Sequence, residues 1–225
     1  MSFALCASLA LAGAVHAADS TELWPELSAY VGLGEGARLY LDAAHAQGKE
    51  SDVKTLDVSA YVDLSIKPLL RPELWSDDWQ RSRYLFARLG YTRVFKTTVD
   101  GTEVSEDRGI VSLHARAPLP AEVWAEGRVR ADLRWIGGEY STRYRLRLEV
   151  NREWTVAEHP VLPYFNVEAF YDTRYAGWAR TLYQGGVEVT LDKRFRYEIV
   201  LARLLDRLPA PQSVNALSLV AKWYF

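Results

Sequence analysis

The sequence predicts an all-β protein whose strands close into an antiparallel transmembrane up-and-down β-barrel of about 12 strands, with 10 as the alternative. Two observations predict this fold. Polar and apolar side chains alternate through most of the chain, and along residues 122–135 they form two chemically opposite faces. The chain also closes on an apolar stripe that ends in an aromatic residue, as is typical of bacterial outer-membrane barrels: Leu217, Leu219, Ala221, Trp223 and Phe225.

The first expected element is a signal peptide over residues 1–17. Residues 3–18 are apolar and uncharged, and small residues at Val15 and Ala17 predict cleavage after Ala17. The stretch is too short to cross a bilayer as a helix. It lacks the usual leading Lys or Arg, so a start upstream of Met1 is an alternative. A lipoprotein signal is disfavoured because Leu5 stands where a small residue should precede Cys6.

Residues 18–225 form one expected outer-membrane β-barrel domain, since no repeat or linker divides them. Tight turns are expected at 34–36, 118–120 and 192–193, and longer loops at 97–107 and 173–178 on the opposite side. Alternation predicts eleven strands, at 24–33, 37–46, 54–67, 82–96, 108–117, 122–135, 142–155, 162–173, 179–191, 194–207 and 213–225. Bacterial single-chain barrels usually have an even number of strands, so either residues 69–80 hold another strand or the first segment is not a full member.

Alternation alone does not decide which face lies outside, because a soluble lipocalin-like barrel would turn its apolar face inward. The export signal, the terminal Phe225 and large aromatics near strand ends favour the membrane version, with the apolar face in outer-membrane lipid. Those aromatics are Phe95, Trp135 and Trp223. The sequence therefore predicts a location in the cell outer membrane. Trp223 and Phe225 are the predicted signal for the barrel assembly machinery.

Several segments carry a resemblance to a known family. They are "WPELSAYV", "DLRW", "STRYRLRLE", "PYFNVEAFYDTRYAGWARTLYQGGVEV" and the ending "VNALSLVAKWYF". Together they resemble the bacterial family called domain of unknown function 2490, a set of predicted outer-membrane β-barrel proteins, most strongly from Arg108 onward. The resemblance implies a barrel and a location but no activity. Residues 199–205 depart from the polar, Tyr-rich strand expected there, which argues against a binding role for that strand.

The polar face predicts a barrel interior in which arginines lie beside carboxylates on neighbouring strands, the geometry of charge-assisted hydrogen bonds. These pairs are expected to brace the barrel, and a small polar or anionic solute could pass or bind among them. Charges along 122–135 nearly cancel, which argues against a strongly anion-selective pore. The candidate binding residues are Arg128, Arg130, Asp132, Arg134, Arg143, Arg145, Arg147, Glu149, Glu168, Asp172, Arg180 and Glu188.

Other classes of function have weaker support in the sequence. The 27 basic and 29 acidic residues leave no basic field for nucleic acid. His45, His114 and His159 lack metal-ligand spacing, so neither a metal nor a cofactor is expected. A lipid hydrolase would use Ser112 and His114, but residues two apart on a strand are about 7 Å apart, too far for a direct hydrogen bond unless the side chains lean together. The prediction is a non-enzymatic protein, with surface interaction through loops 97–107 and 173–178 as an alternative.

Overall fold

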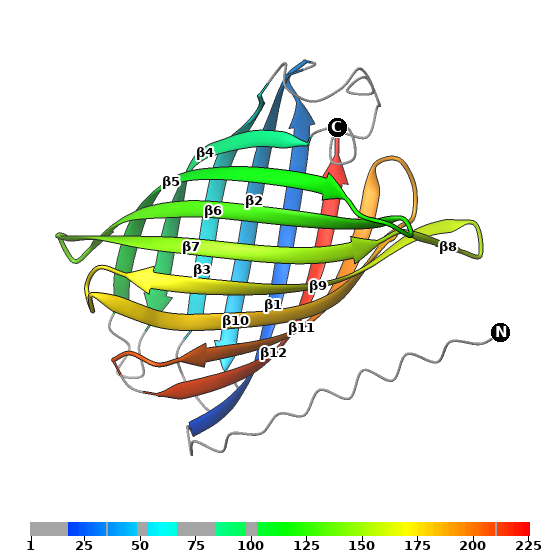
Figure 1. The fold of residues 1–225 in the computed structure, drawn as a ribbon. Coiled ribbons are helices and arrows are strands. Elements are labelled where there is room, and N and C mark those ends of the chain that lie inside the picture. The colour runs from blue at the N-terminus through cyan, green and yellow to red at the C-terminus, as the bar shows by residue number, and fades with distance from the viewer. Residues whose placement is uncertain (1–17, 35, 49–53, 67–83, 98–102, 210) are drawn as a thin grey trace.

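The computed structural model describes residues 18–34, 36–48, 54–66, 84–97, 103–209 and 211–225. These residues contain no helix, and hence none that could cross a membrane. They form twelve strands (Figure 1): β1 (Ala18–Gly32), β2 (Ala37–Gly48), β3 (Lys54–Ser65), β4 (Leu85–Thr97), β5 (Glu103–Pro118), β6 (Val123–Ile136), β7 (Glu139–Arg152), β8 (Trp154–Val156), β9 (His159–Asp172), β10 (Gly177–Thr190), β11 (Phe195–Asp206) and β12 (Gln212–Tyr224). The predicted all-β barrel is confirmed.

Eleven of the twelve strands form a closed ring. Neighbours in the chain pair antiparallel from β1 to β7, β7 then pairs with β9, and the antiparallel order continues to β12. The short β8 pairs only with β9 and extends the hairpin between β7 and β9. The ring closes where β1 pairs with β12 in parallel, from Ala18 beside Gln212 to Tyr30 beside Tyr224.

The ring differs from the predicted barrel in strand number and at its seam, the parallel pairing of β1 with β12. The eleven segments that alternate in the sequence are the eleven ring strands, and the twelfth strand, β8, lies outside the ring. The first predicted strand is a full strand of the barrel, because β1 pairs along both of its edges. An odd ring of alternating strands must join its first and last strands in parallel. The further strand considered for residues 69–80 lies outside the described residues.

The predicted turns lie together at one end of the barrel. Since consecutive strands alternate in direction, the turns at 33–36, 119–122 and 191–194 share the end where β12 finishes. β3 also ends and β4 also begins at this end, and residues 67–83 between them lie outside the described residues. At the opposite end the connections 98–102 and 173–176 are shorter than expected, because β5 begins at Glu103 and β10 at Gly177.

A row of tyrosines crosses the seam on the inner wall. Tyr224, Tyr30, Tyr40 and Tyr61 occupy adjacent register positions on β12, β1, β2 and β3. Their rings are stacked with successive centroids 4.7, 4.6 and 5.1 Å apart. The Arg88 guanidinium lies 4.5 Å from the centroid of the Tyr40 ring. Aromatic stacking and a cation–π contact therefore reinforce the backbone pairing that closes the barrel.

Two inward glycines leave room for tyrosine rings. Gly90 is the register neighbour of Tyr61, and a Cβ atom at Gly90 would lie 2.2 Å from Cδ1 of that ring. Gly186 is likewise the neighbour of Tyr164, where a Cβ would lie 2.6 Å from the ring. A tyrosine that covers a neighbouring glycine is a known way to stabilise a curved sheet. The packing of the two tyrosine rings therefore requires glycine at both positions.

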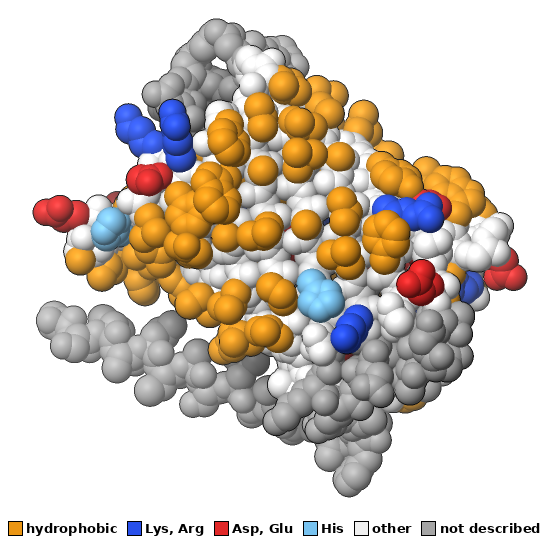
Figure 2. Space-filling model, turned by 180° about the vertical axis from the view of Figure 1, so that it is seen from behind, with side chains coloured by type: hydrophobic (Ala, Val, Ile, Leu, Met, Phe, Trp, Pro, Cys, Tyr) orange, Lys and Arg blue, Asp and Glu red, His pale blue; other side chains and the backbone are white. Residues whose placement is uncertain are grey.

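The two faces of the ring differ in chemistry. Hydrophobic side chains spread over the outer surface seen in Figure 2. Leu201, which points outward from β11, is 69% exposed. The inner wall is mostly polar, with charged residues concentrated on β5, β6, β7 and β9. One part of the inner wall is apolar, around Phe170, Leu182, Ala202, Leu204 and Ala216. This interior apolar cluster was not predicted from the sequence.

Candidate binding site in the barrel interior

Strands β6 and β7 place four arginines directly opposite one another. Register pairs Arg128 with Arg147 and Arg130 with Arg145. Like charges opposite each other destabilise a sheet unless other groups compensate them. The neighbouring carboxylates on the inner wall supply that compensation, and we call these four residues the arginine cluster.

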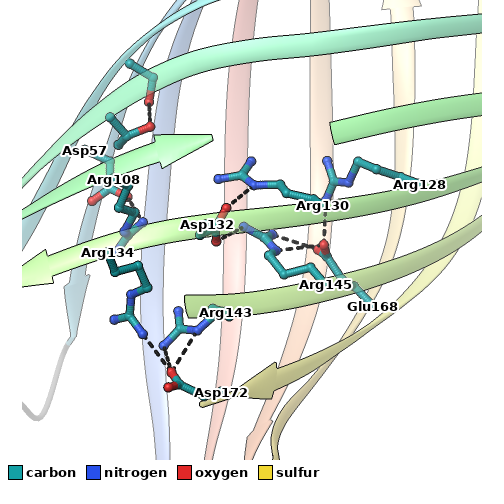
Figure 3. A network of polar contacts seen from close by, with 12 residues as sticks. Asp57, Arg108, Arg128, Arg130, Asp132, Arg134, Arg143, Arg145, Glu168 and Asp172 are labelled. Atoms are coloured by element: carbon teal, nitrogen blue, oxygen red, sulfur yellow. Dashed lines mark hydrogen bonds and ion pairs between the residues drawn. The ribbon is translucent and has the colours of Figure 1, made fainter. Parts of the chain in front are cut away.

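Glu168 on β9 is the main acceptor for the arginine cluster (Figure 3). Its carboxylate receives a hydrogen bond from Arg128 Nη2 at 2.6 Å. Arg145 donates two more, from Nε and Nη2, each at 2.8 Å. The Glu168 side chain is buried, so these charge-assisted bonds are shielded from water. This carboxylate joins β6, β7 and β9 into one unit.

Two aspartates extend the network along the same strands. Asp132 accepts from Arg130 Nε, and its second oxygen lies 3.6 Å from Arg145 Nη1. Asp172 lies at the end of β9, where Arg134 Nη1 donates at 2.7 Å and Arg143 Nη2 at 3.1 Å (Figure 3). Each aspartate thus lies between two guanidinium groups from β6 and β7.

The other predicted site residues lie on the inner wall but in separate pairs. Arg147 Nη2 lies 3.6 Å from the Glu149 carboxylate, beside the arginine cluster. Arg180 donates to Asp206 at 2.5 and 2.7 Å, between β10 and β11. Glu188 accepts from Arg196 at 3.0 Å and from Lys222 at 2.7 Å. The twelve predicted residues therefore do not form one site.

Several inner-wall ion pairs were absent from the predicted set. Asp63 accepts bonds from Arg38 at 2.7 Å and from Arg88 at 2.6 Å, and its side chain is fully buried. Glu106 accepts from Arg108 at 2.6 Å and from Arg134. These residues occupy inward positions of their strands. The alternation of inward and outward positions along each strand was therefore the sequence signal that could have identified these residues.

A cavity of about 430 Å³ lies beside the arginine cluster. Four buried atoms of its lining form no hydrogen bond within the described part of the chain: Arg128 Nε, Arg147 Nε, Asn151 Oδ1 and Asn166 Oδ1. Buried polar groups normally form hydrogen bonds with protein or water, so this wall can bind a polar solute. The same cavity has apolar lining from Leu162, Leu182, Val200 and Val220. We call it the lumenal chamber.

The far side of the lumenal chamber is acidic. Glu26 on β1 and Asp42 on β2 both line it, and Ser28 Oγ lies 3.2 Å from the first carboxylate and 3.0 Å from the second. Neither carboxylate forms an ion pair with a basic side chain of the described residues. The chamber therefore has an acidic wall and a basic wall, which agrees with the near-balance of charge expected from the sequence.

Ser112 and His114 lie closer together than strand spacing predicted. The Ser112 Oγ is 3.1 Å from His114 Nε2, which is the case in which the two side chains lean together along the strand. The imidazole leans along β5 toward the serine, and the Phe86 ring stacks on it with centroids 4.2 Å apart. His114 Nδ1 lies 3.5 Å from Glu126 Oε1 on β6.

The remaining site residues lie at the seam. Trp223 and Phe225 project outward at the end of β12, and the Phe225 amide donates to the Tyr30 carbonyl at 2.8 Å. Among the described residues, no three His, Cys, Asp or Glu side chains are grouped to hold a metal ion.

No family model matches the chain, and no curated protein matches it. Among solved structures, the beta domain of the Bordetella autotransporter BrkA is similar, with 18% identity and a TM-score of 0.47. That similarity covers 77% of this chain and 78% of the autotransporter domain.

Proposed function

We propose that the chain is an outer-membrane β-barrel protein with a braced interior that holds a small polar or anionic solute. The observation that carries the location is the distribution of side chains: apolar residues cover the outside of a closed ring, while buried ion pairs fill the inside. A water-soluble barrel would have the opposite distribution. The signal peptide over residues 1–17, assembly through Trp223 and Phe225, and the family resemblance belong to this same proposal.

Leu201→Arg tests the membrane location. The side chain lies on the outer surface of β11, so an arginine there would face lipid. We expect the free energy of folding into phospholipid vesicles to become less favourable by about 2 kcal/mol. The measurement is urea-dependent folding into vesicles, followed by tryptophan fluorescence and by heat-modifiable migration on gels.

Leu191→Arg is the matched control, because Leu191 is exposed in the turn after β10 rather than on a strand. We expect this variant to fold into vesicles much like the unchanged protein. If Leu201→Arg also had no effect, or made the protein soluble without lipid, the outer surface would be a water-facing one.

The braced interior is proposed to act as a chamber and not as a wide pore. Arginines of β6 are paired with carboxylates of β9 across the intervening β7, as in Arg128–Glu168 and Arg134–Asp172, and the lumenal chamber is only about 430 Å³. The unpartnered Nε atoms of Arg128 and Arg147 offer donors to an anionic group of a solute. Enclosure by both acidic and basic walls favours one bound solute over continuous anion flow.

Planar-bilayer recording tests this chamber. Folded protein is expected to insert without the unitary conductance steps of an open porin, because ion pairs occupy its interior. The same preparation, titrated with inorganic phosphate, is expected to unfold at a higher temperature since a bound anion stabilises the folded state. Regular conductance steps with no stabilisation by phosphate would mean that the interior is an open pore and not a binding chamber.

A further inference from the structure

Three polar side chains form a connected series on the inner wall of β5 and β6. Ser112 Oγ contacts His114 Nε2 at 3.1 Å, and His114 Nδ1 contacts Glu126 Oε1 at 3.5 Å. We propose that Ser112 is the nucleophile of a carboxylic ester hydrolase, with His114 as the general base and Glu126 as a positioning residue. This activity goes beyond the proposed function, which needs no chemistry.

The contacts define the role of each imidazole nitrogen. When Nε2 accepts the Ser112 hydroxyl proton, Nδ1 carries the other proton and donates it toward Glu126. The Phe86 ring, inclined by 16° to the imidazole, keeps the ring in this plane. Arg147 Nη2 lies 3.4 Å from the Glu126 carboxylate and holds it beside the histidine. A nucleophile, a base and a group that orients the base are therefore present together.

Positive charge flanks the nucleophile. In the strand register Ser112 lies between Arg88 on β4 and Arg130 on β6. Arg130 is held to Asp132 through its Nε, and its Nη atoms form no hydrogen bond with other described residues. Arg88 donates through Nε and Nη2 to Asp63, so the Nη atoms of Arg130 are the donors proposed to stabilise the oxyanion.

The surroundings indicate the class of substrate. Both flanking arginines, His114 and Glu126 line the lumenal chamber. The apolar lining from β9 to β12 belongs to the same chamber and suits a hydrocarbon chain. An ester with a short apolar acyl chain fits these walls and a volume of about 430 Å³.

Hydrolysis on this arrangement needs only water as a second reactant. Ser112 Oγ bonds to the acyl carbon while its proton moves to His114 Nε2. That proton passes to the leaving alkoxide as the ester C–O bond breaks, which leaves an acyl-serine. The oxygen of a water molecule then bonds to the acyl carbon and gives a proton to His114, which returns it to Ser112 Oγ as the acyl–serine bond breaks. The products are an alcohol and a carboxylic acid.

The test uses the whole folded barrel in detergent, with a fluorophosphonate probe and with p-nitrophenyl butyrate. We expect a probe adduct on Ser112, located by mass spectrometry of the labelled peptide. Ser112→Ala is expected to abolish labelling and to lower ester hydrolysis by at least about a thousandfold. Glu126→Gln is expected to lower kcat by about a hundredfold or more with little change in KM, since it acts through the histidine.

Ser218→Ala is the matched control, because Ser218 is a buried serine like Ser112 and its side chain lines the lumenal chamber. It should keep both labelling and hydrolysis. A folded, heat-modifiable protein with no adduct on Ser112, or a Ser112→Ala variant that hydrolyses the ester at the unchanged rate, overturns the proposal. Neither outcome affects the membrane location, because Ser112→Ala should still fold into vesicles.

Discussion

Glu168→Gln is expected to lower the free energy of unfolding by about 3–5 kcal/mol. The Glu168 carboxylate is 1% exposed and receives three hydrogen bonds from Arg128 and Arg145. Its removal leaves Arg128 without an ion-pair partner in the described chain. A buried charge that loses its partner retains the cost of its desolvation. Urea-induced unfolding from lipid vesicles measures the change.

Glu139→Gln provides the comparison for this variant. Glu139 is exposed at the start of β7, so the same chemical change there should alter stability by no more than about 0.5 kcal/mol. Equal stability of the two variants would mean that the Glu168 contacts do not brace β6, β7 and β9. Binding or catalysis would then have to explain the geometry of the network.

Gly90→Ala is expected to destabilise the barrel by about 3 kcal/mol and to reduce the folded yield. The added Cβ would lie 2.2 Å from Cδ1 of Tyr61 and 2.6 Å from the carbonyl oxygen of Ala60. The first overlap can be relieved by movement of a ring, but the second involves backbone and requires β3 and β4 to separate. Tyr61 is also the last ring of the stacked row. Urea unfolding and heat-modifiable migration measure both effects.

Gly127→Ala separates this overlap from the general effect of replacing glycine in a strand. A Cβ at Gly127 would meet only Leu148 Cδ2, at 3.9 Å. That contact is ordinary, so the variant is expected to fold as well as the unchanged protein or slightly better. A Gly90→Ala/Tyr61→Ala double variant should recover only part of the loss, because the Ala60 carbonyl remains in place. Full recovery of stability in the double variant would mean that the overlap with the Tyr61 ring accounts for the whole loss.

Alternation was sufficient to predict the strands and the direction of their side chains. In residues 126–134 every second residue is charged, and those positions lie on the inner wall of β6. Side chains in a strand alternate by simple geometry, so a local pattern carries this information. The same parity applies to Asp63, which lies in the regularly alternating residues 56–66. Glu106 was missed because residues 97–107 were predicted to be a loop, whereas β5 begins at Glu103.

The seam, the chamber and the serine contact depend on information that is not local. Parallel pairing of β1 with β12 depends on the total number of strands, which no single segment reveals. The apolar part of the inner wall is assembled from β9, β10, β11 and β12, so no single segment reveals it. On β11 both faces are apolar over residues 199–202, and alternation there does not mark the inner face. The Ser112–His114 contact depends on a side-chain rotamer, and the stacking with Phe86 from β4 selects it.

The parallel seam also determines where the two ends of the chain emerge. An even ring returns the chain to the compartment in which it began, but this ring leaves Ala18 at one end and Phe225 at the other. Epitopes attached before Ala18 and after Phe225 would therefore be displayed to opposite sides of a membrane. An antibody added outside intact cells would reach one of them, and the other would become accessible only after the membrane is opened.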